Sequence, residues 1–247
     1  MLVFVLNAGS SSLKYQLIDI KSKELKASGL VERIGIDGIL KHEIGENKKI
    51  TFELPIPTHK EAIELVLRIL TNDETKVINS IDEIKAIGHR VVHGGEYFKG
   101  SVIVDDEVIR KIEELIPLAP LHNPANILGV KICKDLMPKV PNVVTFDTAF
   151  HQTMPMENFL YAVPYADYTE HHLRKYGFHG TSHYYVSQEA IKLLNKKDSK
   201  VIVCHLGNGS SVCAVKDGKS ISTSMGLTPL EGLVMGTRSG DIDAGVI

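Results

Sequence analysis

The first ninety residues alternate short apolar runs with polar turns. Leu2–Leu6 predicts a buried strand that ends in a polar turn starting at Asn7. In Leu13–Ile20 apolar and polar residues alternate, so the chain is expected to return as a second strand. We expect a third strand at Leu25–Arg33 and a buried strand at Ile84–Val92. These strands form the β part of a predicted α/β protein.

Apolar residues at helical spacing occur between and after these strands. A helix capped by Thr58 is expected to run to Leu70, with its apolar residues on one face. Val108–Leu115 and Asn126–Leu136 have the same spacing, and Pro124 suits the first turn of the second of these helices. The sequence therefore places three helices in this part of the chain.

The carboxyl-terminal part predicts one helix and three strands. Ser182–Leu194 has helical spacing, and Lys200–Leu206 reads as a strand that runs into a glycine- and serine-rich turn. Ser211–Val215 and Ser220–Thr223 are predicted to form a hairpin. Asp217-Gly218 between them is a strong turn signal.

The sequence suggests two domains. Val143–Phe146 predicts a strand that ends on Asp147, and we place a boundary near Phe150. We expect an amino-terminal domain over 1–150 and a second, incomplete domain over 151–247.

An internal repeat links the two predicted domains. In each copy an apolar strand leads through a leucine into a Gly-Ser-Ser turn at one constant offset; the aligned residues are Leu6, Gly9, Ser10 and Ser11, and Leu206, Gly209, Ser210 and Ser211. Successive backbone N–H groups in such a turn form an anion-binding concavity. Two copies predict two half-sites that hold one polyphosphate.

The alternative for either turn alone is a tight β-hairpin in a duplicated domain. The presence of both turns, with Lys14 two residues beyond Ser12, favours phosphate binding. Neither turn fits the P-loop pattern G-x-x-x-x-G-K-[ST].

Composition narrows the class of protein. The 247 residues are 43% hydrophobic and 23% charged, which is a globular balance. With 28 basic and 30 acidic residues the net charge is −2, which favours neither nucleic acid nor an anionic membrane. The three cysteines, Cys133, Cys204 and Cys213, read as free thiols, so we expect a cytoplasmic protein.

Seven motifs resemble those of the acetate kinase family in order and approximate spacing. They are Asn7-Ala8-Gly9-Ser10-Ser11-Ser12-Leu13-Lys14, Gly88-His89-Arg90-Val91-Val92-His93-Gly94-Gly95, Pro120-Leu121-His122-Asn123-Pro124, Phe146-Asp147-Thr148-Ala149-Phe150, Tyr176-Gly177-Phe178-His179-Gly180-Thr181-Ser182-His183, His205-Leu206-Gly207-Asn208-Gly209-Ser210-Ser211-Val212 and Gly236-Thr237-Arg238-Ser239-Gly240-Asp241. The resemblance covers the whole chain. It implies a duplicated actin-like ATPase (ribonuclease H-like) fold whose second domain is incomplete.

The resemblance also implies the site residues. Arg90 and Arg238 would hold the acyl carboxylate and the transferred phosphoryl group, His179 would stabilise the transition state, and Asp147 would organise the site. Asn7 would lie close to Mg²⁺ (or Mn²⁺). The remaining positions would bind phosphate (Ser10, Ser12, Lys14, His205, Leu206, Gly207, Asn208 and Gly209) or form an apolar pocket for the acyl methyl group (Val92, Leu121, Phe178 and Pro229).

Phosphoryl transfer to a carboxylate suits this set of residues. A carboxylate with a pKa of about 4–5 is already ionised at neutral pH, so the reaction needs no general base. Charge neutralisation and in-line positioning must then provide the catalysis. The resemblance implies that ATP and acetate are the substrates and that the protein is a homodimer.

Several alternatives stay open. A propionate or butyrate kinase of the same family, or an inactive nucleotide- or acyl-phosphate-binding module, fits the same motifs. Taken singly, Arg90 fits a surface ion pair, Asp147 a turn cap, and Val92 and Phe178 ordinary core. His179 and His183 have a spacing compatible with zinc, but no Glu lies between them in the H-E-x-x-H manner.

The resemblance also predicts residues beyond Ile247. Members of the family are longer, and their C-terminal part would complete the second domain. It would also carry the adenosine-binding residues and a glutamate that shares the magnesium with Asn7. Asp243-Ala244-Gly245 stands where the family usually continues with Asp-Pro-Ala.

Overall fold

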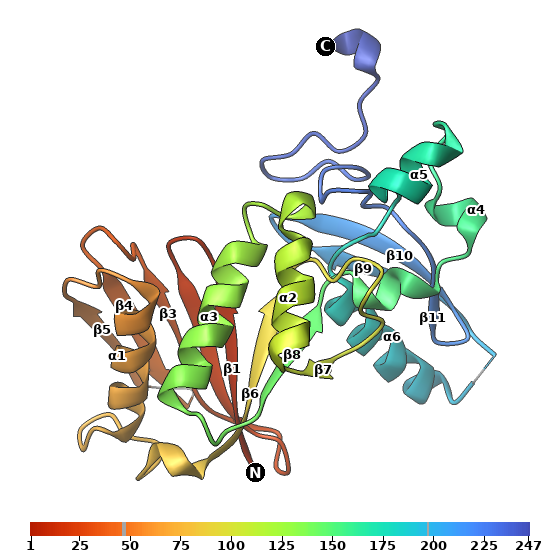
Figure 1. Cartoon of the computed structure of the whole chain (residues 1–247). Helices are drawn as coiled ribbons and strands as arrows, with labels where there is room; N and C mark the ends of the chain where they lie inside the picture. The colour runs from red at the N-terminus through yellow and green to blue at the C-terminus, as the bar shows by residue number, and fades with distance from the viewer. Residues whose placement is uncertain (46–47, 197) are drawn as a thin grey trace. The chain divides into compact units, whose positions relative to one another are not determined.

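The computed structural model describes residues 1–45, 48–196 and 198–247, which form two compact units (Figure 1). The first unit comprises Met1–Val91 and Ser101–Thr145, and the second comprises Val92–Gly100 and Phe146–Ile247. The division into related domains over 1–150 and 151–247 stays a proposal. Among the described residues, no helix has the length and apolar character needed to cross a membrane.

A mixed sheet forms the centre of the first unit. Its described strands are β1 (Leu2–Ala8), β2 (Leu13–Asp19), β3 (Glu24–Glu32), β4 (Ile39–Ile44), β5 (Lys48–Glu53), β6 (Ile84–Val91), β7 (Val102–Ile103) and β8 (Asn142–Phe146), in the order β5-β4-β3-β2-β1-β6-β8-β7. β1 pairs antiparallel with β2 and parallel with β6. The sheet thus joins an antiparallel meander to a parallel crossover.

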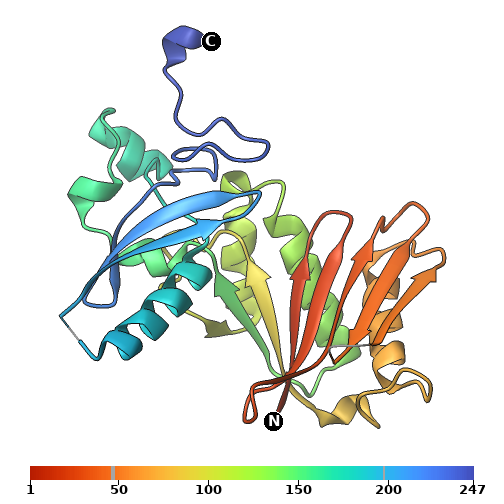
Figure 2. The same ribbon diagram turned by 180° about the vertical axis from the view of Figure 1, so that it is seen from behind.

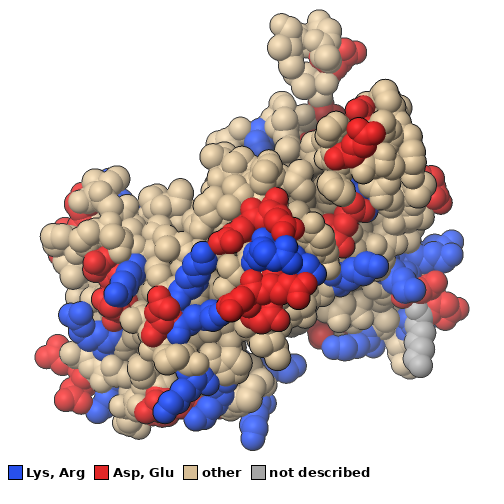
Figure 3. All heavy atoms as spheres, in the orientation of Figure 1, with Lys and Arg blue, Asp and Glu red and all other residues tan. Residues whose placement is uncertain are grey.

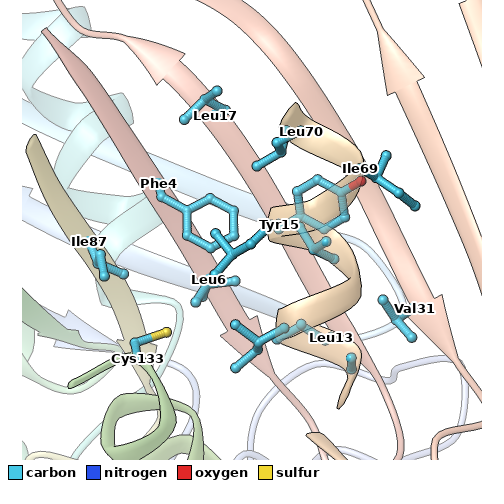
Figure 4. Close-up of a cluster of buried hydrophobic side chains, with 14 of the residues drawn as sticks. Phe4, Leu6, Leu13, Tyr15, Leu17, Val31, Ile69, Leu70, Ile87 and Cys133 are labelled. Carbon is cyan, nitrogen blue, oxygen red and sulfur yellow. The ribbon is translucent and has the colours of Figure 1, made fainter. Parts of the chain in front are cut away.

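Three helices cover one face of this sheet: α1 (His59–Thr71), α2 (Asp106–Glu114) and α3 (Asn123–Leu136) (Figure 1). The side chain of Thr58 accepts a hydrogen bond from the backbone N–H of Lys60 and so caps α1. Phe4, Leu13 and Leu70 belong to the buried core between this face and the helices (Figure 4). The period-2 pattern of β1 and β2 buries every second side chain here.

Among the described residues of the first unit, no helix lies over the opposite face of β1–β5, as the view from behind shows (Figure 2). The polar members of the alternation, such as Lys14 and Gln16 on β2, point to this second face and are exposed.

The second unit contains a smaller antiparallel sheet. Its described strands are β9 (Lys200–Leu206), β10 (Ser210–Lys216) and β11 (Lys219–Thr223), in the order β11-β10-β9. Its helices are α4 (Met156–Phe159), α5 (Tyr165–His171) and α6 (Gly180–Leu194), of which α6 packs against β9. Val203, Cys213 and Val215 form its buried core with Phe150 and Val201. Short 3-10 helices occur at η1 (Ile81–Glu83), η2 (Ile116–Leu118), η3 (Ala149–Thr153) and η4 (Ala244–Val246).

The predicted strands and helices are present, with ends shifted by a few residues. α3 begins at Asn123, because Pro124 occupies its first turn, as expected. Asp217 and Gly218 have φ values of 52° and 77°, which confirms a tight turn with left-handed backbone at both positions. β4, β5, β7, α4 and α5 were not predicted. β5 is a half-exposed edge strand with three charged residues, so it lacks a clear apolar pattern.

The two Gly-Ser-Ser turns differ in strand pairing, so the prediction of two equivalent turns is wrong. Leu6 pairs with Tyr15, whereas Leu206 pairs with Ser210. The first turn therefore leaves Ser11 exposed in a loop, whereas its counterpart Ser211 is fully buried within β10. A shorter connection in the second copy converts loop serines into strand residues.

Candidate active site

In the first unit, the predicted phosphate loop is the four-residue connection between β1 and β2. The backbone N–H of Gly9 donates a hydrogen bond of 2.8 Å to the carbonyl oxygen of Ser12. A Cβ at residue 9 would lie 2.9 Å from Oγ of Ser12, so glycine allows the tight turn. Nε2 of His59 donates to the carbonyl oxygen of Gly9 at 2.7 Å. The loop is thereby tied to α1, with Ser10 exposed.

Asn7, Lys14 and Arg90 form a row beside this loop on the uncovered face of the sheet. Asn7 pairs with Lys14 across β1 and β2, and Nη1 of Arg90 on β6 donates to Oδ1 of Asn7 at 3.4 Å. They line an open hollow of about 490 Å³, whose other lining residues are Val5, Leu6, Tyr15, Gln16, Ser28, Gly29, Leu30, Lys41 and Glu43. Lys14, Lys41 and Arg90 outnumber Glu43, so the hollow favours an anion.

In the second unit, a backbone hydrogen bond joins Asp147 to Gly180, the residue after His179. Asp147 follows β8 and is 3% exposed. Its carbonyl oxygen accepts a 2.8 Å hydrogen bond from the N–H of Gly180, the first residue of α6. His179 precedes α6 with a φ of 58°, a left-handed conformation that costs an L-residue about 1–2 kcal/mol. The hydrogen bond between Gly180 and Asp147 fixes the start of α6 and thereby the position of His179.

Other side chains hold the imidazole of His179 on two sides. Oγ of Ser211 lies 2.9 Å from its Nδ1, and the same oxygen lies 2.7 Å from Nε2 of His183. The ring of His205 stacks on that of His179, with 4.0 Å between centroids and 27° between planes. Nδ1 of His205 lies 2.9 Å from Oγ of Ser182. The ring of His179 therefore has a defined position.

The second loop brings Gly209 against His179 and Arg238. A Cβ at residue 209 would lie 3.0 Å from Nη2 of Arg238 and 3.3 Å from Nε2 of His179. Nη1 of Arg238 donates to the carbonyl oxygen of Pro229, and the N–H of Gly236 donates to the carbonyl oxygen of Asn208 at 3.1 Å. Glycine at 209 thus gives room for a guanidinium and an imidazole beside the loop.

An apolar cluster lies in the same unit. Val92 and Phe178 are packed with Met225 and Met235, each less than 9% exposed. The structure thus brings together two of the four residues predicted for the acyl pocket. Pro229 contacts Arg238 through its carbonyl oxygen. Leu121 belongs to the first unit, where it is 79% exposed.

Two ion pairs hold the segments that carry this cluster. Nη1 of Arg174 donates to Oε1 of Glu96 at 2.9 Å, and its guanidinium lies 3.6 Å from the ring centre of Phe159. The next residue, Lys175, pairs with Glu231 at 2.5 Å. Consecutive residues thus tie down the segment after Val92 and the loop near Pro229.

Buried histidines in both units are hydrogen-bonded as neutral rings. Desolvation lowers the pKa of His89, His93 and His151 to about 4 and that of His183 to about 3. Nε2 of His151 donates to the carbonyl oxygen of Phe178 at 3.0 Å, while its Nδ1 lies 2.9 Å from Oγ of Ser220. His151 therefore supports the backbone just before His179.

The sequence did not indicate His151, Met225 or Met235 as site residues, and it gave His183 only a structural role. Ser211 was predicted as part of a phosphate-binding turn, whereas its Oγ lies beside His179 and His183. The spacing of His179 and His183, one helical turn apart, could have shown that both rings face the same neighbour. No pattern in the sequence indicated the two methionines.

Two solved structures and one family model match nearly all of this chain. The fold is that of the actin-like ATPases: 99% of the chain superposes on 62% of the crystal structure of an acetate kinase from Porphyromonas gingivalis, at 48% identity and a TM-score of 0.96. A propionate kinase structure from Francisella tularensis matches 99% of the chain, at 48% identity and a TM-score of 0.92. The chain belongs to the acetokinase family, whose model matches residues 2–247.

A curated relative, the acetate kinase of Lachnoclostridium phytofermentans, is 58% identical over 249 residues. This match covers all of the chain and 63% of that relative. The chain thus spans somewhat less than two thirds of the length of such relatives.

Proposed function

We propose that the protein is an acetate kinase that transfers the γ-phosphoryl group of ATP to acetate, giving acetyl phosphate and ADP. The observation that carries this proposal is the approach of His179 and Arg238 to Gly209, where a permanent cation and a hydrogen-bond donor share one glycine loop. Membership of the acetokinase family supports it.

The proposed reaction is a direct in-line displacement. The acetate oxygen is ionised and attacks phosphorus without a general base, while the bond to the ADP oxygen breaks. Arg90 and Arg238 would neutralise the carboxylate and the equatorial phosphoryl oxygens. His179 would donate a hydrogen bond to the same oxygens, a contribution worth roughly 100- to 1,000-fold in rate for comparable donors. Asp147 would organise the site from the end of β8, where its carbonyl oxygen accepts a hydrogen bond from the first residue of α6.

The two loops would divide the work of binding ATP. Ser10, Ser12 and Lys14 would contact phosphate from the first unit, and Lys14 lines the cationic hollow. The loop from His205 to Gly209, which includes exposed Leu206 and Gly207, would contact phosphate from the second unit. The backbone of each loop can approach an anion closely because glycine carries no side chain.

The donor set fits Mg²⁺ (or Mn²⁺) bound chiefly through phosphate. Mg²⁺ prefers oxygen ligands, keeps several waters and needs only one or two protein groups beside the nucleotide. Asn7 would supply an amide oxygen from the first unit and Asp147 a carboxylate from the second. No cluster of three His, Cys, Asp or Glu able to hold a metal occurs among the described residues. When bound, the metal would neutralise phosphate charge. Asn7 would hold it in the first unit.

Acetate is the proposed acid, and propionate is the main alternative. Val92 and Phe178 would contact the acyl methyl group, with Leu121 and Pro229 as further predicted walls. The similarity to a propionate kinase favours keeping that acid under test. An apolar pocket separates acids that differ by one methylene only weakly, by roughly 1–3 kcal/mol.

We propose a cytoplasmic homodimer without nucleic-acid or membrane partners, in keeping with the three free cysteines and the balanced charge. On the face that carries α2 and α3, basic and acidic side chains alternate (Figure 3). Lys131 pairs with Glu113 at 2.7 Å and Lys134 with Asp106 at 3.1 Å. The described residues of this face thus form a mixed surface.

The test is acyl phosphate formation, trapped with hydroxylamine, from Mg-ATP with acetate, propionate or butyrate. It should be run on this chain and on the product of the longest reading frame that contains it. We expect acetate to give the highest kcat/KM. A higher kcat/KM for propionate or butyrate would favour a propionate or butyrate kinase. Nucleotide binding without turnover by either product would indicate a binding module and would contradict the proposal.

A further inference from the structure

We propose that Ser211 and His183 are positioning residues that fix the tautomer of His179, with its single ring proton on Nε2. The catalytic meaning of this arrangement rests on the proposed function, but the tautomer itself does not. Three side chains form the relay His183–Ser211–His179: one from α6, one from β10 and one from the residue just before α6.

His183 is fully buried. Its Nδ1 has no hydrogen-bond partner among the residues that the structure describes, whereas its Nε2 lies 2.7 Å from Oγ of Ser211. Buried N–H groups without an acceptor are rarer than buried acceptors without a donor. The pKa of His183 is lowered to about 3, so the ring carries one proton at neutral pH. That proton belongs on Nε2, which donates to Ser211.

The Ser211 hydroxyl proton also needs an acceptor. A serine hydroxyl has one O–H and two lone pairs, and one lone pair is occupied by the N–H of His183. Nδ1 of His179 lies 2.9 Å from the same oxygen. Ser211 can donate its proton there only if Nδ1 carries none. The alternative, in which both histidines donate to Ser211, would leave the buried hydroxyl proton without an acceptor.

His179 therefore keeps its proton on Nε2, the nitrogen that would lie 3.3 Å from a Cβ at Gly209. That nitrogen faces the loop proposed to bind phosphate, where a neutral N–H can donate to a phosphoryl oxygen. The stacked ring of His205 fixes the plane of the imidazole, and Ser211 fixes its proton. The arrangement holds the N–H of His179 on the side of this loop before phosphate arrives.

The direct test is two-bond ¹H–¹⁵N correlation NMR of the ¹⁵N-labelled 247-residue chain, with His179 assigned by the loss of its signals in His179→Gln. We expect Nε2 to be protonated and Nδ1 to be bare at neutral pH. In Ser211→Ala, Nδ1 loses its donor and both tautomers become populated. Ser211→Cys keeps the side-chain volume with a weaker donor and should give an intermediate spectrum.

Tyr15→Phe is the matched control, because it removes another buried hydroxyl–imidazole contact, 2.5 Å from Nδ1 of His42, in the first unit and outside the relay. It should leave the His179 pattern unchanged. A proton on Nδ1 of wild-type His179, or an unchanged pattern in Ser211→Ala and Ser211→Cys, would overturn the proposal. The wild-type spectrum decides it even where a variant fails to fold.

A kinetic measurement connects the tautomer to catalysis. In the product that forms acyl phosphate, Ser211→Ala should lower kcat about fivefold, the effect of one neutral hydrogen bond, with KM for ATP and acetate nearly unchanged. An altered tautomer with unchanged kcat would overturn the catalytic role. If no product forms acyl phosphate, the proposed function fails, and the NMR result alone decides the relay.

Discussion

The carbonyl oxygen of Asp147 lies against the N–H of Gly180 at 2.8 Å, close enough that a Cβ at residue 180 would collide with it. This contact joins the end of β8 to the start of α6 and sets the position of His179 between them. We expect Gly180→Ala to destabilise the fold by about 1–3 kcal/mol, because the backbone must shift to admit the methyl group.

Urea unfolding followed by circular dichroism measures this change. Gly100→Ala is the matched control, since no atom lies within 4 Å of a Cβ built at Gly100. Equal unfolding midpoints for the two variants would show that the approach of Asp147 is not tight in solution.

Acid should destabilise the chain between about pH 6.5 and pH 4. Four buried histidines have pKa values lowered to about 3–4, whereas an unfolded histidine has a pKa of about 6.5. The unfolded state therefore binds more protons in this window, and stability falls as the pH falls. The full contribution is present above pH 6.5. Each histidine adds a slope of about 1 kcal/mol per pH unit.

His89→Gln isolates one of these contributions. His89 is 3% exposed and its Nε2 donates to Oδ1 of Asn142 at 2.7 Å, a bond that glutamine can replace in part. Urea midpoints between pH 5 and 8 should fall less steeply on acidification in the variant, and both proteins should be flat above pH 7. Parallel curves would contradict the pKa assignment.

Substrate selectivity should depend on Val92. Val92→Ala enlarges the cluster with Phe178, so the ratio of kcat/KM for propionate to that for acetate should rise about tenfold, as expected for one methylene. Val130→Ala removes the same groups from a side chain that is 1% exposed in α3 and should leave the ratio unchanged. An unaltered ratio in Val92→Ala would show that Val92 does not contact the acyl group.

Local patterns predicted most of the fold. Capping by Thr58, Pro124 in the first turn of α3 and the Asp217-Gly218 turn depend on neighbouring residues, so one sequence suffices to find them. β5 depends on pairing with β4 at a sheet edge, and its charged residues hid it.

The site residues likewise comprise some that the sequence indicated and one whose role it did not. The motifs indicated His179, Arg238 and Gly209, and the structure brings them together within the second unit. Ser211 was hidden by the repeat, because its sequence counterpart Ser11 is exposed in a loop. Its role follows from the shorter hairpin, a register that the apolar pattern did not reveal.

The most direct test of the proposed activity is the rate of acetyl phosphate formation after removal of each predicted arginine. In the product that is active with Mg-ATP and acetate, Arg90→Ala and Arg238→Ala should each lower kcat/KM by at least about 100-fold. Arg110→Ala, which loses only an exposed ion pair with Glu114, should stay near wild type. Variants of Arg90 and Arg238 that retain turnover within a few fold of wild type would contradict the proposed site.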